Sequence, residues 1–187
     1  NYSRALELYT QASQFYPDDE ELRINLSDAL WGVGYRKQSL EVVESLYRIR
    51  PSTRLGVYLA KTYMGLDRYA EATDLLLQLN GGRSHSKEMG NTLAISLLAQ
   101  GRYQEALQVS ALTIAKFGAS HSLLMAQGKA QFYLKQFKPA LRSFEQAKKL
   151  DDADEENISF LSATQSLLGT GDNKALQKEI VPTHPVR

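Results

Sequence analysis

The side chains best suited to metal binding and acid–base catalysis are sparse in this sequence. It contains three histidines, His85, His121 and His184, and no cysteine. No two histidines have the i, i+4 spacing that places two zinc ligands on one face of a helix. Without cysteine the chain also has no thiolate nucleophile and no disulfide. The sequence therefore predicts no metal site and no cofactor.

A glycine-rich segment has the composition of a phosphate-binding loop. It reads Gly81-Gly-Arg-Ser-His-Ser-Lys87. The six-residue glycine spacing before Lys-Ser/Thr is missing, and no predicted strand precedes the segment. Glycine commonly ends helices, so the segment is interpreted as a loop between helices, with a hinge as the alternative.

Serines and carboxylates are plentiful, but no nucleophile–base–acid arrangement with an oxyanion donor is recognisable. Asn25-Leu-Ser27 and Asn157-Ile-Ser159 match the glycosylation sequon, yet both fall in predicted helices, which favours chance matches. The acidic runs 18–21 and 151–156 stand where helices are predicted to begin, so capping is preferred to metal binding. The sequence predicts a protein that is not an enzyme.

Charge and hydropathy restrict the partners. Twenty-two basic residues against twenty-one acidic ones give a net charge of +1. Without a basic strip lined by aromatic residues, we expect no nucleic-acid binding. No apolar run approaches the roughly 18 residues of a membrane span, so no membrane insertion is expected. The helical pattern begins at Asn1 without an initiator methionine, and we interpret the chain as a fragment of a longer protein.

One short motif recurs along the chain at a fixed period. An aromatic residue stands three positions before a small one in Tyr2-Ser-Arg-Ala-Leu6, Tyr69-Ala-Glu-Ala-Thr73, Tyr103-Gln-Glu-Ala-Leu107 and Phe137-Lys-Pro-Ala-Leu141, with a weaker copy at Arg36-Lys-Gln-Ser-Leu40. The small residues are separated by 34, 33, 34 and 34 positions: Ala5, Ser39, Ala72, Ala106 and Ala140. A period of this length predicts stacked helical repeats.

Each period contains two predicted helices. Residues four and seven positions after the small residue continue an i, i+4, i+7 stripe, as Phe144 and Ala147 do after Ala140. Twelve positions before it stands another small residue, which close approach of two helices requires: Ser27, Ala60, Ala94 and Gly128.

This pattern resembles the tetratricopeptide repeat, a helix–turn–helix unit of 34 residues. The matching features are both small positions, the aromatic entry to the second helix, and the terminal prolines Pro17 and Pro51. The copies depart from it at Arg36, which replaces the aromatic entry, and at the residues that replace the proline, Ser84, Gly118 and Asp152. The resemblance implies an all-α, right-handed superhelix (α-solenoid) of tetratricopeptide-like repeats.

We expect one repeat domain over residues 1–187. Its predicted parts are an orphan helix in 1–17, full repeats at about 20–52, 53–86, 87–120 and 121–154, an incomplete capping repeat in 155–181 and a tail in 182–187.

The resemblance also implies which residues of the first helices face the concave side. One row is apolar in all four full repeats: Trp31, Met64, Leu98 and Phe132. Two further rows are Asp28, Lys61, Ile95 and Lys129, and Ile24, Val57, Asn91 and Met125. We expect partner binding at Trp31, Met64, Leu98, Phe132, Asp28, Lys61, Asn91, Met125 and Lys129. The alternative is that the apolar row only packs helices together.

The expected function is a non-catalytic scaffold or adaptor that binds a protein or peptide partner on the concave face, and its expected setting is a bacterial multiprotein assembly. Lys61 and Lys129 would favour an acidic ligand. Two alternatives remain: self-association through the open ends of the stack, which would give a homo-oligomer, and a regulatory arm of a larger enzyme. The absence of cysteine and the repeat style favour a bacterial protein of the cell envelope, with the cytoplasm as the alternative.

Overall fold

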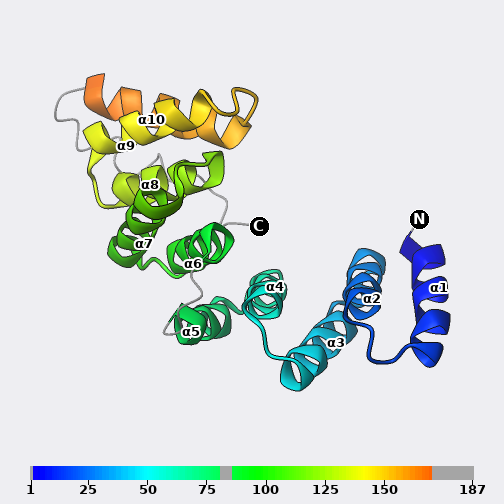
Figure 1. The fold of residues 1–187 in the computed structure, drawn as a ribbon. Coiled ribbons are helices and arrows are strands. Elements are labelled where there is room, and N and C mark those ends of the chain that lie inside the picture. Colours follow the sequence, from blue (N-terminus) through cyan, green and yellow to red (C-terminus); the bar gives the residue numbers. More distant parts are fainter. Residues whose placement is uncertain (1, 81–85, 170–187) are drawn as a thin grey trace. The chain divides into compact units, whose positions relative to one another are not determined.

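The computed structural model describes residues 2–80 and 86–169, which fold into helices without any strand (Figure 1). In chain order the helices are α1 (Tyr2–Phe15), α2 (Glu20–Val33), α3 (Arg36–Ile49), α4 (Thr53–Met64), α5 (Tyr69–Asn80), α6 (Lys87–Ala99), α7 (Tyr103–Phe117), α8 (His121–Tyr133), α9 (Phe137–Lys148) and α10 (Glu155–Gly169). The prediction of an all-α chain of helix–turn–helix repeats is confirmed.

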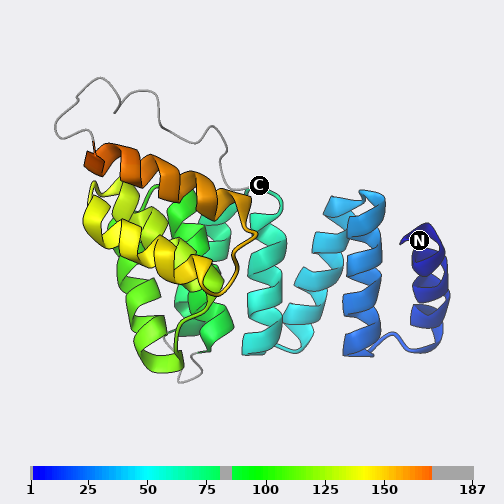
Figure 2. The same cartoon turned by 90° about the horizontal axis from the view of Figure 1, so that it is seen from above.

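The helices belong to two compact units. Helices α1 to α5 form the first unit, and α6 to α10 form the second. In the first unit, α2 pairs with α3 and α4 with α5, and Figure 2 shows its blue-to-cyan helices running in alternating directions. In the second unit, α6 pairs with α7, α8 with α9, and α10 packs on α9. The single domain expected over 1–187 stays a prediction, and residues 170–187 of the expected cap and tail lie outside the described residues.

The periodic small residues lie where the two helices of a repeat meet. Ala72, Ala106 and Ala140 are completely buried in the second helices. In the first repeat the contact is polar, because Ser27 and Ser39 share a hydrogen bond of 2.8 Å between their Oγ atoms. A Cβ atom on Gly128 of α8 would stand 2.5 Å from the Phe144 ring of α9. The small residues thus permit the close helix contact that the sequence predicted.

A second periodic feature is the capping residue of the first helices, and only its acidic members were predicted from the sequence. Asp19 accepts a hydrogen bond from Leu22 N at 2.8 Å, as predicted for the first acidic run. Three serines cap the other first helices in the same way: Ser52, Ser86 and Ser120. Before α10, Asp154 accepts from Glu156 N at 2.9 Å. Each cap satisfies an amide that the helix leaves without a partner.

The turn inside each repeat also follows the period. A residue with positive φ lies five positions before the small residue of the second helix: Gly34 (98°), Asp67 (59°), Gly101 (72°) and Lys135 (61°). This left-handed conformation reverses the chain within a few residues, and it favours glycine because other residues carry a Cβ atom. Two repeats adopt the same turn with Asp67 or Lys135 in place of glycine, so glycine alone does not predict every turn from the sequence.

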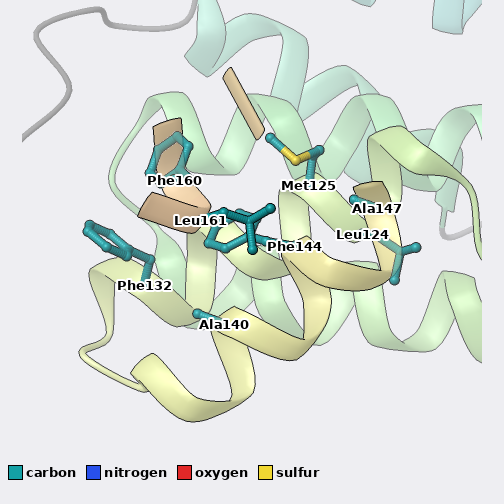
Figure 3. Close-up of a cluster of buried hydrophobic side chains, with 8 residues drawn as sticks. All are labelled: Leu124, Met125, Phe132, Ala140, Phe144, Ala147, Phe160 and Leu161. Atoms are coloured by element: carbon teal, nitrogen blue, oxygen red, sulfur yellow. The ribbon is translucent and has the colours of Figure 1, made fainter. Parts of the chain in front are cut away.

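The second unit contains an aromatic core between α8, α9 and α10 (Figure 3). Phe144 and Phe160 stack with ring centroids 5.2 Å apart, and Figure 3 shows Phe144 near the centre of the cluster. Its buried members are Leu124, Met125, Phe132, Ala140, Phe144, Ala147, Phe160 and Leu161. Through Phe160 and Leu161, α10 packs on the last helix pair. The capping repeat expected over 155–181 stays a prediction.

Gly128→Ala tests the close contact at the small position. Overpacking typically costs about 1–3 kcal/mol, and the helical preference for alanine offsets up to about 1 kcal/mol of it. We expect the free energy of unfolding in urea to fall by about 1 kcal/mol. Gly169→Ala is the matched control, because a Cβ atom there has no neighbour within 4 Å. A Gly128→Ala variant more stable than the unchanged protein, as the helical preference alone would make it, would contradict the contact.

Candidate functional site

Two members of the apolar row, Trp31 and Met64, belong to the first unit, and both side chains are partly exposed. Trp31 lies near the end of α2, and Met64 is the last residue of α4. The far edge of the Trp31 indole rests on Gly65, where a Cβ atom would stand 2.6 Å from Cη2 and Cζ2. Glycine at the end of α4 therefore provides the space in which the indole lies across the end of that helix.

The departure from the repeat pattern at Arg36 accounts for the environment of Trp31. In the second unit, each aromatic entry residue packs on an aromatic residue at the end of α8: Tyr103 of α7 stacks on Tyr133, and Phe137 of α9 contacts Phe132 edge-to-face. In the first repeat, the Arg36 guanidinium lies 5.3 Å from the Trp31 ring centroid instead. A cation–π contact with a flexible, charged side chain covers the indole less permanently than an aromatic ring.

A small pocket of about 170 Å³ adjoins Trp31. It is lined by Asp28, Trp31, Ser39, Tyr58, Lys61 and Thr62. Tyr58 of α4 donates a hydrogen bond to Asp28 Oδ1 of α2, which connects the two first helices. Burial, then this hydrogen bond, raises the pKa of Tyr58 to about 12, so the hydroxyl stays protonated near neutral pH. We call Asp28, Trp31, Tyr58, Lys61 and Met64 the Trp31 surface.

In the second unit, the other two members of the apolar row are packed inside the chain. Leu98 is 8% exposed and Phe132 is 6% exposed. Phe132 makes an edge-to-face contact with Phe160 of α10, with ring centroids 5.4 Å apart. This placement agrees with the packing alternative for these two residues, and their role in binding stays a prediction.

The remaining expected binding residues are also engaged within the second unit. Met125 is buried in the aromatic core. Asn91 accepts a hydrogen bond from Ser122 at 2.9 Å. Lys129 Nζ lies 2.6 Å from Glu156 and 5.6 Å from the Phe160 ring centroid. Since the Lys129 ammonium already has an internal carboxylate partner, its attraction for an acidic ligand is reduced.

The remaining candidate side chains are the histidines, the glycine-rich segment, the acidic residues and the sequon asparagines. His121 Nε2 lies 3.1 Å from Asp154 Oδ2, which joins the beginnings of α8 and α10. His85, His184 and Gly81 to His85 of the glycine-rich segment lie outside the described residues. Within 2–80 and 86–169, no group of three or more His, Asp or Glu side chains is arranged to hold a metal ion. Asn157 of the second sequon is buried, and its Nδ2 donates to Phe144 O at 3.2 Å.

Two contributors to the surroundings of Trp31 were missed in the sequence. Tyr58 gives no signal of its own, because its partner Asp28 stands 30 positions earlier. Arg36 gives a signal, since it is the one non-aromatic entry residue among the five copies. Among the described helices, none is both long enough and apolar enough to cross a membrane.

The structure is similar to solved structures of repeat proteins. MamA AMB-1 is 21% identical, with a TM-score of 0.68 over 81% of this chain and 90% of that chain. YrrB, described as a TPR protein with an unusual peptide-binding site, is 16% identical, with a TM-score of 0.66 over 90% and 87%. A thermophilic TPR protein in Thermus thermophilus is 15% identical, with a TM-score of 0.69 over 88% and 91%. No protein-family model and no curated protein matches the sequence.

These likenesses show the fold of the chain. The helix pairs, their period of 34 residues and the similarity to TPR structures agree, so the chain has the tetratricopeptide-repeat fold. The resemblance recognised in the sequence is thereby confirmed at the level of fold.

Gly65→Ala tests the placement of Trp31. The backbone of Gly65 is right-handed (φ −66°, ψ −12°), so alanine is allowed there and only the indole obstructs its Cβ atom. We expect the indole to be displaced into solvent, with a red-shifted emission, easier quenching by acrylamide and unchanged helix content. Gly169→Ala, with no neighbour to displace, should leave the emission of the single tryptophan unaltered. An unshifted Gly65→Ala spectrum would refute the contact.

Proposed function

We propose that this chain, with its tetratricopeptide-repeat fold, is a non-catalytic protein-interaction module that binds a segment of a partner protein on its first helices. The observation that carries the proposal is the partly exposed Trp31 beside a small pocket that Asp28, Tyr58 and Lys61 help to line. In the repeat family that the sequence resembles, first helices line the concave face. Extended concave surfaces of stacked repeats are suited to binding another chain.

The Trp31 surface has the composition of a binding hot spot. Tryptophan and tyrosine are enriched among the residues that dominate binding energies. Burying one apolar side chain of a partner beside Trp31 would contribute about 1.5–3 kcal/mol before ordering costs. On this side the cost is small, because the Tyr58–Asp28 hydrogen bond already fixes α2 against α4.

The charges around Trp31 favour an acidic partner segment. Arg36 and Lys61 are both exposed cations near the indole, and together they outnumber the single nearby carboxylate, Asp28. An apolar anchor flanked by Asp or Glu would combine burial against Trp31 with attraction to both cations. The partner is thus an extended or helical segment of this composition, and membership of a bacterial multiprotein assembly is part of the same proposal.

Site-specific photo-crosslinking tests this function. A photo-reactive amino acid at Met64 should crosslink one protein partner, and the yield should fall at least about tenfold in Trp31→Ala/Lys61→Ala, equivalent to about 1.4 kcal/mol of binding energy. Leu112→Ala/Lys138→Ala removes an exposed apolar side chain and an exposed lysine from the second unit as the matched control. Equal yields from all three proteins, or the same products from a probe at Leu112, would contradict the proposal.

Self-association is the second candidate function, and α1 favours it. No residue of α1 is buried, and several of its large apolar side chains are exposed. These include Tyr2, Leu8 and Phe15, and Tyr16 follows them. The partner in that case would be a second copy of this chain, held by α1 and not by the Trp31 surface.

A further inference from the structure

A groove of about 570 Å³ adjoins Leu59 and Tyr63 of α4, whereas the pocket beside Trp31 adjoins Tyr58, Lys61 and Thr62 of the same helix. The groove is lined by Glu44, Tyr47, Arg48 and Pro51 of α3 and its end, Leu59 and Tyr63 of α4, and Glu71, Asp74, Leu75 and Gln78 of α5. On both α3 and α5 these residues follow i, i+3, i+4, i+7 spacing, so each second helix offers one continuous face. We call this hollow the α3–α5 groove.

The floor of the groove is apolar and continuous with the core. Leu59 is buried, and it packs with Tyr47, Tyr63 and Leu75 in one cluster that also contains Leu40 and Val43. The Tyr47 ring is close to Gly56, where a Cβ atom would stand 3.2 Å from Cε2. The volume falls in the range of about 300–1,000 Å³ that is usual for ligand sites.

The rim of the groove has an excess of carboxylates. Glu44, Glu71 and Asp74 line it, against a single lining cation, Arg48. Glu71 is neutralised by Arg68, whose Nε lies 2.9 Å from Glu71 Oε1. Within the described residues, no basic group lies within ion-pair distance of Glu44 or Asp74. The Arg68 guanidinium also acts electrostatically on Glu44 from a greater distance. Both carboxylates, one from each second helix, can therefore still form an ion pair with a cation from outside.

Tyr63 holds Glu44 at the rim. Its hydroxyl donates to Glu44 Oε1 at 2.7 Å, and the Arg68 guanidinium lies 4.6 Å from the centroid of its ring. Burial, then the hydrogen bond to Glu44, raises the pKa of Tyr63 to about 12, so the hydroxyl remains a donor near neutral pH. The carboxylate keeps lone pairs on both oxygens for a further donor.

We propose that the α3–α5 groove is a second docking site, for a basic peptide segment in which leucine-like side chains alternate with Lys or Arg. The apolar side chains would cover Leu75 and the exposed parts of the Tyr47 and Tyr63 rings, while the cations meet Glu44 and Asp74. This partner is opposite in charge to the one proposed for the Trp31 surface. The two sites therefore bind different segments, and the chain joins them.

Fluorescence anisotropy with a defined peptide tests this docking site. The probe is the fluorescein-labelled heptapeptide Gly-Lys-Leu-Arg-Leu-Lys-Gly, and its counterpart carries Glu at the three basic positions. We expect saturable binding of the basic peptide, at least about tenfold tighter than that of the acidic one. Glu44→Gln/Asp74→Asn should weaken binding by about fivefold, the loss of roughly 1 kcal/mol from two exposed charge pairs.

The variants are chosen so that folding and general charge do not decide the result. In Glu44→Gln, the new side-chain amide oxygen would still accept the hydrogen bond from Tyr63, and Asp74→Asn alone alters an exposed side chain. Asp18→Asn/Glu145→Gln removes two exposed carboxylates elsewhere and should leave binding unchanged. Trp31→Ala should also leave it unchanged, which separates this site from the Trp31 surface.

Three results would each overturn the second docking site. They are no binding of the basic peptide at millimolar concentration, equal weakening by Asp18→Asn/Glu145→Gln, and binding that is lost in Trp31→Ala but kept in Glu44→Gln/Asp74→Asn. The last result would move the peptide to the first helices. A crosslinking failure at Met64 leaves the groove unaffected, because the two sites use different residues.

Discussion

The close approach of two helices at small side chains is the contact on which the rest of this structure depends. A leucine in place of Ala72, Ala106 or Ala140, each completely buried, would force the helices of a repeat apart. The same contact fixes the rotation of each helix about its axis. Once Gly128 faces Phe144 and Ser27 faces Ser39, the remaining positions of both helices are assigned to the core, to a neighbouring repeat or to solvent.

Equivalent positions of the repeat form different surfaces in the two units, because the side chains that pack on them differ. In the first repeat Arg36 replaces an aromatic entry residue, and Trp31 remains partly exposed beneath a guanidinium. In the second unit Phe137 and Phe160 enclose Phe132 from two sides. A position that is equivalent in the repeat is therefore a binding candidate in one unit and a core residue in the other.

Much of the fold could be predicted from the sequence because its determinants are local and periodic. The predicted helix–turn–helix repeats are present as α2 to α9, because the small positions repeat every 33 or 34 residues. Only part of the candidate site could be predicted, because it depends on contacts between distant residues. Nothing near Lys129 in the sequence indicates that Glu156 neutralises it, or that Tyr58 would reach Asp28. The α3–α5 groove could not be predicted for the same reason. Its faces on α3 and α5 are each ordinary amphipathic helix surfaces, and a hollow forms only because the two faces lie on either side of Leu59.

Residue-resolved hydrogen exchange of the whole chain measures the central contact most directly, because amide protection follows local opening. If buried small residues hold each repeat together, the slowest amides will lie in the middle of the paired helices, around Ala72, Ala106 and Ala140. Helix α1 should exchange much faster, since it has no buried residue. Protection in α1 equal to that in α7 or α9 would contradict the account, because helix formation alone would then explain the stability.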